Sequence, residues 1–254
     1  MPQLTAITRF PVKGLGPDPL TAIELETGRT LPHDRAWAIE NGPGPFDPAR
    51  PAHVKKKHFL MLAQQAELVR LACRFNSLDD TFSVRGENGE TVSVDLADPA
   101  THAPLLELLK TLLGEQVRGE MRIVHAPGQA MTDIPEPYIS LINAASVRDL
   151  SDKVGRPLDP MRFRGNLLID GLAPWQEFDW IGRTMRLGET VLKAQSRIGR
   201  CAATSVDLAT GRRDIDLPAA LFEHYGHTHC GLYLSVETGG RIALGDRVLL
   251  DAAG

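Results

Sequence analysis

The chain has 254 residues, of which 43% are hydrophobic and 24% are charged. This length is enough for one large domain or two small ones, each with its own core. The net charge of −4 excludes a strongly basic binder of nucleic acid or anionic membranes, and the N-terminus shows neither a signal peptide nor a membrane span. The three cysteines are far apart and odd in number, which favours a reducing compartment over a disulfide framework. We therefore expect a cytoplasmic protein that binds no nucleic acid and no membrane.

The N-terminal half is predicted to be rich in β-strands, because its apolar residues recur mostly with a period of two. Strands are expected within residues 4–13, 20–28 and 34–41. The proline-rich stretch that follows is too constrained for a helix. Residues 81–96 predict a hairpin in which Asn88 and Gly89 both supply the positive φ angles of a tight turn.

The leucine-rich stretch 103–114 predicts an amphipathic helix that ends at Gly114. Further along, residues 136–155 predict a strand and then a helix closed by Gly155. Residues 191–211 predict a strand entering a turn, 217–226 a helix, and 231–251 two or three strands. The fold class expected is β-rich α+β. We place an N-terminal domain at 1–120 and a C-terminal, β-dominated domain with a few helices at 121–254.

Cys201 is the first candidate functional residue, because a thiolate is both a nucleophile and a soft metal ligand. Arg197 and Arg200 lie close in sequence and would favour the thiolate. Taken alone, however, a single cysteine is more often an inert core residue. The crowded stretch 224–230, "HYGHTHC", has three histidines and a cysteine, but their spacing fits solvated histidines better than convergent zinc ligands.

A scattered set of polar residues near strand boundaries is the second candidate site. Guanidinium groups and a lysine suit phosphate and polar heterocycles if they meet in space, and are plain surface charge if they do not. The members are Lys13, Arg35, Arg162, Arg164 and Asn166. The basic run at residues 55–58 is either a docking patch for an acidic redox partner or a solvated loop.

Several short stretches together resemble one family, the MOSC proteins. They are "FPVKG" at 10–14, "HDRAWAI" at 33–39, "RFRGN" at 162–166, "IGRC" followed by "TSVDLATG", and "GLYLSV" through "GGRIALGDRV". Their order resembles an N-terminal MOSC β-barrel domain packed on a C-terminal MOSC β-barrel domain. This arrangement is that of the mitochondrial amidoxime-reducing component and its bacterial relatives.

The resemblance implies a molybdenum cofactor, a pyranopterin (molybdopterin) whose molybdenum is bound by the thiolate of Cys201. Lys13 and Arg35 would then hold the phosphate end of the cofactor, and Gly14 would also belong to the cofactor-binding residues. The pterin and the metal would be lined by Arg162, Arg164, Asn166, Gly199, Arg200 and Tyr233. Asn143, placed before a helix, would add a polar contact.

The function implied is reduction of N-hydroxylated small molecules, such as hydroxylamines and amidoximes, with electrons from a separate redox protein. One alternative is a carrier that binds the cofactor, or a persulfide on Cys201, without turnover. Another is a binding domain whose cofactor site has decayed. Gly14 and Gly199 stand where relatives often have serine, and Phe178 interrupts an acidic pair.

Overall fold

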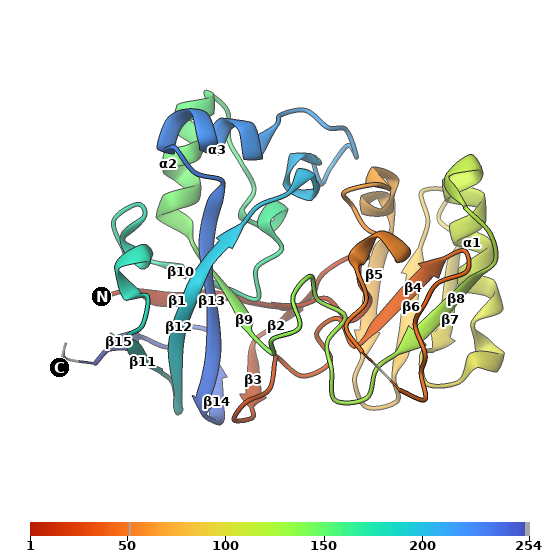
Figure 1. Ribbon diagram of the computed structural model, residues 1–254, viewed down its shortest axis with the longest axis horizontal. Helices are drawn as coiled ribbons and strands as arrows, with labels where there is room; N and C mark the ends of the chain where they lie inside the picture. The colour runs from red at the N-terminus through yellow and green to blue at the C-terminus, as the bar shows by residue number, and fades with distance from the viewer. Residues whose placement is uncertain (51, 252–254) are drawn as a thin grey trace.

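The largest sheet joins the N-terminal strand to the C-terminal half of the chain. The computed structural model describes residues 1–50 and 52–251. In it, eight strands form one curled sheet in the order β15-β11-β12-β13-β9-β10-β1-β2 (Figure 1). The strands are β1 (Gln3–Arg9), β2 (Asp18–Leu20), β9 (Ile139–Asn143), β10 (Leu167–Asp170), β11 (Thr184–Leu187), β12 (Thr190–Gly199), β13 (His229–Thr238) and β15 (Val248–Leu250). Within this sheet β9 and β10 are parallel, and the other described pairs are antiparallel.

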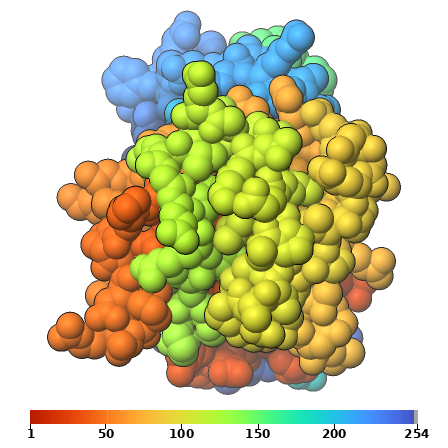
Figure 2. All heavy atoms as spheres, turned by 90° about the vertical axis from the view of Figure 1, so that its right-hand side faces the viewer, coloured from red at the N-terminus to blue at the C-terminus, as the bar shows by residue number. Residues whose placement is uncertain are grey.

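Three small sheets complete the β-structure of the described residues. The pairs are β3 (Ala22–Leu25) with β14 (Gly240–Ala243), and β4 (Trp37–Asn41) with β8 (Met121–His125). The third sheet is β5 (Ala72–Asn76), β6 (Thr81–Arg85) and β7 (Thr91–Asp95). The β4–β8 pair, the third sheet and helix α1 form a second lobe, on the right of Figure 1. Figure 2 views this lobe from outside, with blue segments from the C-terminal part along its upper edge.

Three α-helices end where the sequence predicts. They are α1 (Ala103–Leu113), α2 (Ala144–Val154) and α3 (Leu217–Tyr225). Gly114, Gly155 and Gly226 follow them with φ angles of 51°, 70° and 73°, which glycine adopts without the penalty that a Cβ brings. Short 3₁₀ segments lie at η1 (Lys56–His58), η2 (Ala66–Arg70), η3 (Pro99–Thr101), η4 (Gly114–Gln116), η5 (Pro160–Phe163), η6 (Gln176–Trp180) and η7 (Ala202–Ser205). The β-rich α+β class is therefore confirmed.

Two local predictions differ from the structure. The hairpin β6–β7 forms, but only Gly89 has a positive φ, because the loop has five residues and closes with Gly86 N–H donating to the Glu90 carbonyl at 2.9 Å. The predicted strand 191–211 stops at Gly199, where β13 ends its pairing with β12, and the chain then forms η7.

Two main hydrophobic clusters lie in the two lobes. One packs beneath the large sheet and includes Leu4, Ile7 and Leu141; the other includes Ile39, Phe82 and Leu109. The domain boundary near residue 120 stays a prediction, and the strand pairing adds that β1 and β2 belong to the sheet of the C-terminal half. Within the described residues, no helix has the length and apolarity needed to span a membrane.

Candidate functional site

A cavity of about 170 Å³ brings together ten of the eleven residues that the sequence singled out. Its lining comes from segments far apart in the chain. The ten are Lys13, Gly14, Arg35, Arg162, Arg164, Asn166, Gly199, Arg200, Cys201 and Tyr233. Surface charges scattered along the chain would not be expected to line one cavity. The interpretation of these polar residues as plain surface charge therefore does not fit the structure.

Cys201 lies where the long strand β12 gives way to η7. Its carbonyl accepts hydrogen bonds from the backbone and the hydroxyl of Thr204, both at 3.0 Å, so the turn after it is fixed. The thiol is partly exposed and lines the cavity. Burial raises the pKa of Cys73 to about 11 and that of Cys230 to about 12, which keeps those two thiols neutral. Cys201 is therefore the cysteine placed for chemistry.

Arg200 is held in place by main-chain oxygens. Its guanidinium donates to the Cys230 carbonyl through Nε at 2.7 Å and to the Phe163 carbonyl through Nη1 at 2.8 Å. Burial lowers the pKa of Arg200, because nearby charges do not fully offset its lost hydration. The side chain is thus a partly buried cation, fixed by its hydrogen bonds, next to Cys201.

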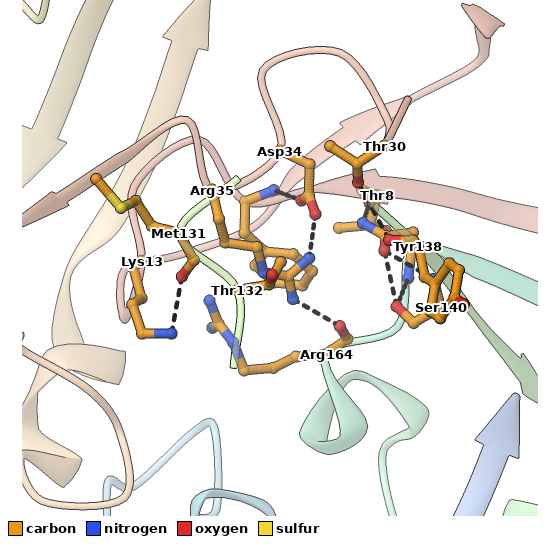
Figure 3. A network of polar contacts seen from close by, with 12 residues as sticks. Thr8, Lys13, Thr30, Asp34, Arg35, Met131, Thr132, Tyr138, Ser140 and Arg164 are labelled. Atoms are coloured by element: carbon orange, nitrogen blue, oxygen red, sulfur yellow. Dashed lines mark hydrogen bonds and ion pairs between the residues drawn. The ribbon is translucent and has the colours of Figure 1, made fainter. Parts of the chain in front are cut away.

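Arg35 and Arg164 form a second cationic group, on the ring of Phe10. Their guanidinium carbons lie 4.4 and 4.1 Å from the ring centroid. Arg35 donates to Asp34 at 2.5 Å and to the Arg164 carbonyl at 2.9 Å (Figure 3). Both residues have left-handed backbones, with φ of 49°, a conformation that costs non-glycine residues energy and that the hydrogen bonds here maintain. Burial and the neighbouring Arg35 charge lower the pKa of Arg164 to about 9.

Lys13 lies at the inner end of the cavity. Its ammonium donates to the Met131 carbonyl at 2.8 Å (Figure 3). It also donates to Asp133 at 2.7 Å. Burial lowers its pKa, although the charge of Asp133 opposes that effect. Gly14, the next residue, has φ 84°, and a Cβ there would lie 2.7 Å from the Leu60 carbonyl. The backbone thus passes too close to Leu60 for any side chain at position 14.

Arg162 and Asn166 line the cavity, but their side chains form hydrogen bonds with other parts of the fold. Arg162 is ion-paired with Asp207 at 2.7 Å and with Asp214 at 2.8 Å. The Asn166 carboxamide accepts from Ser140 Oγ at 2.7 Å and donates to the Thr8 carbonyl at 3.1 Å. The contacts of Asn166 join β1, β9 and the loop before β10, whereas the ion pairs of Arg162 join η5 to the segment 207–214. Both residues therefore shape the cavity wall.

Asn143 is the predicted residue that the structure places outside the cavity. Its side chain caps α2 by accepting from Ala145 N–H at 3.0 Å. The amide nitrogen donates to the Ala173 carbonyl at 3.0 Å and to Glu177 at 2.8 Å. A cofactor contact by Asn143 thus stays a prediction without geometric support.

Sequence reasoning missed three charged residues of this cavity, namely Asp34, Lys56 and Asp133. Lys56 was considered only as part of a basic run, whereas it forms an ion pair with Asp133 at 2.6 Å. The partners of Asp133 are 120 and 77 residues away in the chain, so its neighbouring sequence gave no signal. For the histidine-rich stretch, the described residues contain no cluster of three or more His, Cys, Asp or Glu side chains that could hold a metal ion among themselves.

Comparisons with known proteins point to one family. The MOSC domain family matches residues 128–249. A molybdenum cofactor sulfurase of Anopheles gambiae is 28% identical over 92% of this chain and 34% of its own length. Mitochondrial amidoxime-reducing component 1 of Mus musculus is 28% identical over 45% of this chain and 36% of its own length. The chain thus spans about a third of the curated relatives it matches. Among solved structures, the YUAD protein of Bacillus subtilis is 12% identical, covers 100% of this chain and 98% of its own, and has a TM-score of 0.48.

Proposed function

Residues 128–249 match the MOSC domain family, and from this match we propose that the chain binds a molybdenum cofactor and reduces N-hydroxylated compounds. The observation that supports the proposal most is the convergence of Cys201 with Lys13, Arg35, Arg164 and Arg200 on one cavity. Its relatives include proteins named for molybdenum cofactor sulfuration and for amidoxime reduction. The substrate class, the cofactor and the electron donor belong to the proposal.

The charges of the cavity fit an anionic cofactor. Among the described residues, neither Arg164 nor Arg200 is ion-paired with a carboxylate, although both are partly buried. Arg164 donates to the Leu15 carbonyl at 2.9 Å, and the two carboxylates whose charges act on it, Asp34 and Asp133, are bonded to other cations. A buried cation without a partner is unfavourable, and an anion bound beside it would remove that penalty. Phosphate and the polar edge of a pterin supply such groups.

The donor set also fits molybdenum. The sulfur of Cys201 is a soft ligand, and the guanidinium of Arg200 adds a positive charge to the same cavity. Tyr233 and Tyr138, with ring centroids 6.0 Å apart, give the cavity an aromatic wall. Cys201 would hold the metal, Lys13 and Arg35 the phosphate, and Arg200 and Tyr233 the region around the metal.

The reaction requires that the N–O bond of the substrate break, that the oxygen leave as water, and that two electrons and two protons be taken up. The bound cofactor would supply the two-electron chemistry, and a separate redox protein would supply the electrons. The chain's own contribution is to orient the cofactor through fixed guanidinium groups and to limit access of water to the cavity. Arg200 suits this task because its hydrogen bonds to carbonyls leave it no alternative position.

Molybdenum content tests the metal assignment. The protein is produced in a host that makes the cofactor, and metal is measured by mass spectrometry for the wild type, Cys201→Ala and, as the control, Cys73→Ala. We expect metal in the wild type and the control and its loss in Cys201→Ala. Equal metal in all three proteins would refute Cys201 as the ligand.

Turnover tests the reaction. With a reduced viologen dye as electron source, we expect reduction of a hydroxylamine or an amidoxime by the loaded wild type and none by Cys201→Ala. Loaded protein that turns over neither substrate would exclude the reductase.

One further observation favours a carrier as the second candidate. The relatives that align with 92% of this chain are named molybdenum cofactor sulfurases, and Cys201 is partly exposed in the cavity. A carrier of sulfur would hold a persulfide on Cys201. Intact-protein mass spectrometry would then show one added sulfur atom that is absent from Cys201→Ala, together with no dye-driven turnover.

A further inference from the structure

Asp133 lies between two lysines at the mouth of the cavity. Its Oδ1 accepts from Lys13 Nζ at 2.7 Å and its Oδ2 from Lys56 Nζ at 2.6 Å. Lys13 follows β1, Lys56 begins η1, and Asp133 belongs to the segment between β8 and β9. One carboxylate therefore joins three distant segments of the chain.

The two lysines differ in their access to solvent. The side chain of Lys13 is 8% exposed, whereas those of Lys56 and Asp133 are 36% and 41% exposed. Burial alone would raise the pKa of Asp133, but the charges of Lys13 and Lys56 and their hydrogen bonds outweigh it and lower the pKa to about 2. At neutral pH a carboxylate thus occupies the cationic end of the cavity.

An anionic ligand that binds Lys13 must lie close to this carboxylate, which already accepts from Lys13 Nζ at 2.7 Å. Two anions side by side repel each other, and the repulsion is strong where little water screens it. The ligand can bind Lys13 only if the Asp133 carboxylate moves away or is neutralised. Lys56, already bonded to the outer oxygen of Asp133, is the cation in position to neutralise it.

We propose that Asp133 is an internal anion that competes with an anionic ligand for Lys13, and that Lys56 retains the carboxylate when the ligand displaces it. The ligand class is a phosphate monoester or a similar oxyanion. The inference relies on the proposed function only in assigning such a group to Lys13. Lys56 thereby becomes a specificity-determining residue for the cavity, acting through Asp133.

The test uses inorganic phosphate and the full chain, produced in a host that makes no molybdenum cofactor. Binding is measured by isothermal titration calorimetry at fixed ionic strength, and Lys13→Met identifies the site by loss of binding. We expect Asp133→Asn to bind about fivefold more tightly, because the competitor is gone. Lys56→Met should bind about threefold more weakly, because the displaced carboxylate then has no cation.

The double variant Lys56→Met/Asp133→Asn separates this proposal from a simple effect of net charge. Lys56 also interacts with Cys201 in the same cavity, so competition predicts that Lys56→Met costs much less affinity in the Asp133→Asn background than in the wild type, and the double variant stays tighter than the wild type. A net-charge effect predicts wild-type affinity, since the two charge changes cancel. Lys55→Met and Glu136→Gln are the matched controls, because both residues are exposed and change the charge equally. We expect less than a twofold change in each.

Wild-type affinity in the double variant, or no tightening in Asp133→Asn, would overturn the proposal, as would a failure of Lys13→Met to abolish phosphate binding. Thermal melting of each variant verifies that it is folded. Neither molybdenum nor turnover enters these measurements. Their failure would therefore leave the metal assignment of Cys201 intact, and loss of that assignment would leave the phosphate data intact.

Discussion

Asp34 connects two backbone segments of the cavity through its two carboxylate oxygens. Oδ1 accepts from the Phe10 N–H at 2.8 Å, and Oδ2 pairs with Arg35 at 2.5 Å. The carboxylate is almost fully buried. A buried carboxylate with both oxygens occupied stabilises the chain only while both partners remain. Asp34 therefore couples the stability of the loop after β1 to the position of Arg35.

We predict that Asp34→Asn destabilises the protein by about 2–3 kcal/mol, because the partly buried Arg35 loses its counter-charge while the Phe10 bond is kept. The measurement is the free energy of unfolding in urea. Asp47→Asn, whose side chain pairs with Arg50 at the surface, is the control and should change stability by less than about 0.5 kcal/mol. Equal effects of the two variants would contradict the assigned role.

Serine substitutions at the two glycines of the cavity should have opposite outcomes. A Cβ at Gly199 meets nothing within 4 Å, whereas a Cβ at Gly14 would collide with the Leu60 carbonyl and force a serine into a φ of 84°. We predict that Gly199→Ser changes stability by less than about 0.5 kcal/mol. Gly14→Ser should cost about 2 kcal/mol or more.

Thermal melting checks both glycine variants, and the phosphate titration then shows whether the new hydroxyl of Gly199→Ser contributes to the cavity. If Gly14→Ser melts with the wild type, the close approach to Leu60 is not a constraint. The fold thus requires glycine at position 14 but has room for a side chain at position 199.

These glycines also show what the sequence can and cannot predict. The helices that end at Gly114, Gly155 and Gly226 follow from local periodicity and capping, because neighbours along the chain determine them. The motifs likewise predicted ten residues of the cavity. Asp133, by contrast, binds lysines that are distant in sequence. The position of Asn143 before a helix was predictable, because capping is local, whereas its cofactor contact stays a prediction. Contacts between distant segments depend on packing that no local pattern shows.

Glu177 should make stability depend on pH. Its carboxylate is fully buried and accepts from Asn143 and Ser146, yet burial raises its pKa above the ordinary 4.5. The folded state therefore binds the proton more tightly than the unfolded state does. The contribution of the Glu177 carboxyl group to folding stability is fully present below about pH 4.5 and is lost as pH rises through the raised pKa.

We predict that Glu177→Gln removes this loss of folding stability at higher pH. The free energy of unfolding, measured from pH 4.5 to 8, should fall less steeply with pH in the variant than in the wild type. Glu223→Gln, on the exposed face of α3, is the control and should keep the wild-type slope. A steeper fall in Glu177→Gln would contradict the raised pKa.

Arg213 links the loop that contains Cys201 to the N-terminal lobe. Its Nη1 donates to the Ala202 carbonyl at 2.8 Å, and its Nη2 donates to the Leu62 and Ala63 carbonyls at 3.0 and 2.8 Å. Because one guanidinium fixes both walls of the cavity, its removal should loosen the position of Cys201 more than it lowers global stability.

We predict that Arg213→Met lowers molybdenum content several-fold while lowering stability by about 1 kcal/mol. It should also increase the rate at which iodoacetamide alkylates Cys201 in the metal-free protein, since the mouth of the cavity opens. Arg212→Met, at the exposed neighbouring position, is the matched control for the loss of charge. The alkylation rate is decisive, because a merely structural defect would expose Cys73 and Cys230 as well, whereas a local opening accelerates Cys201 alone.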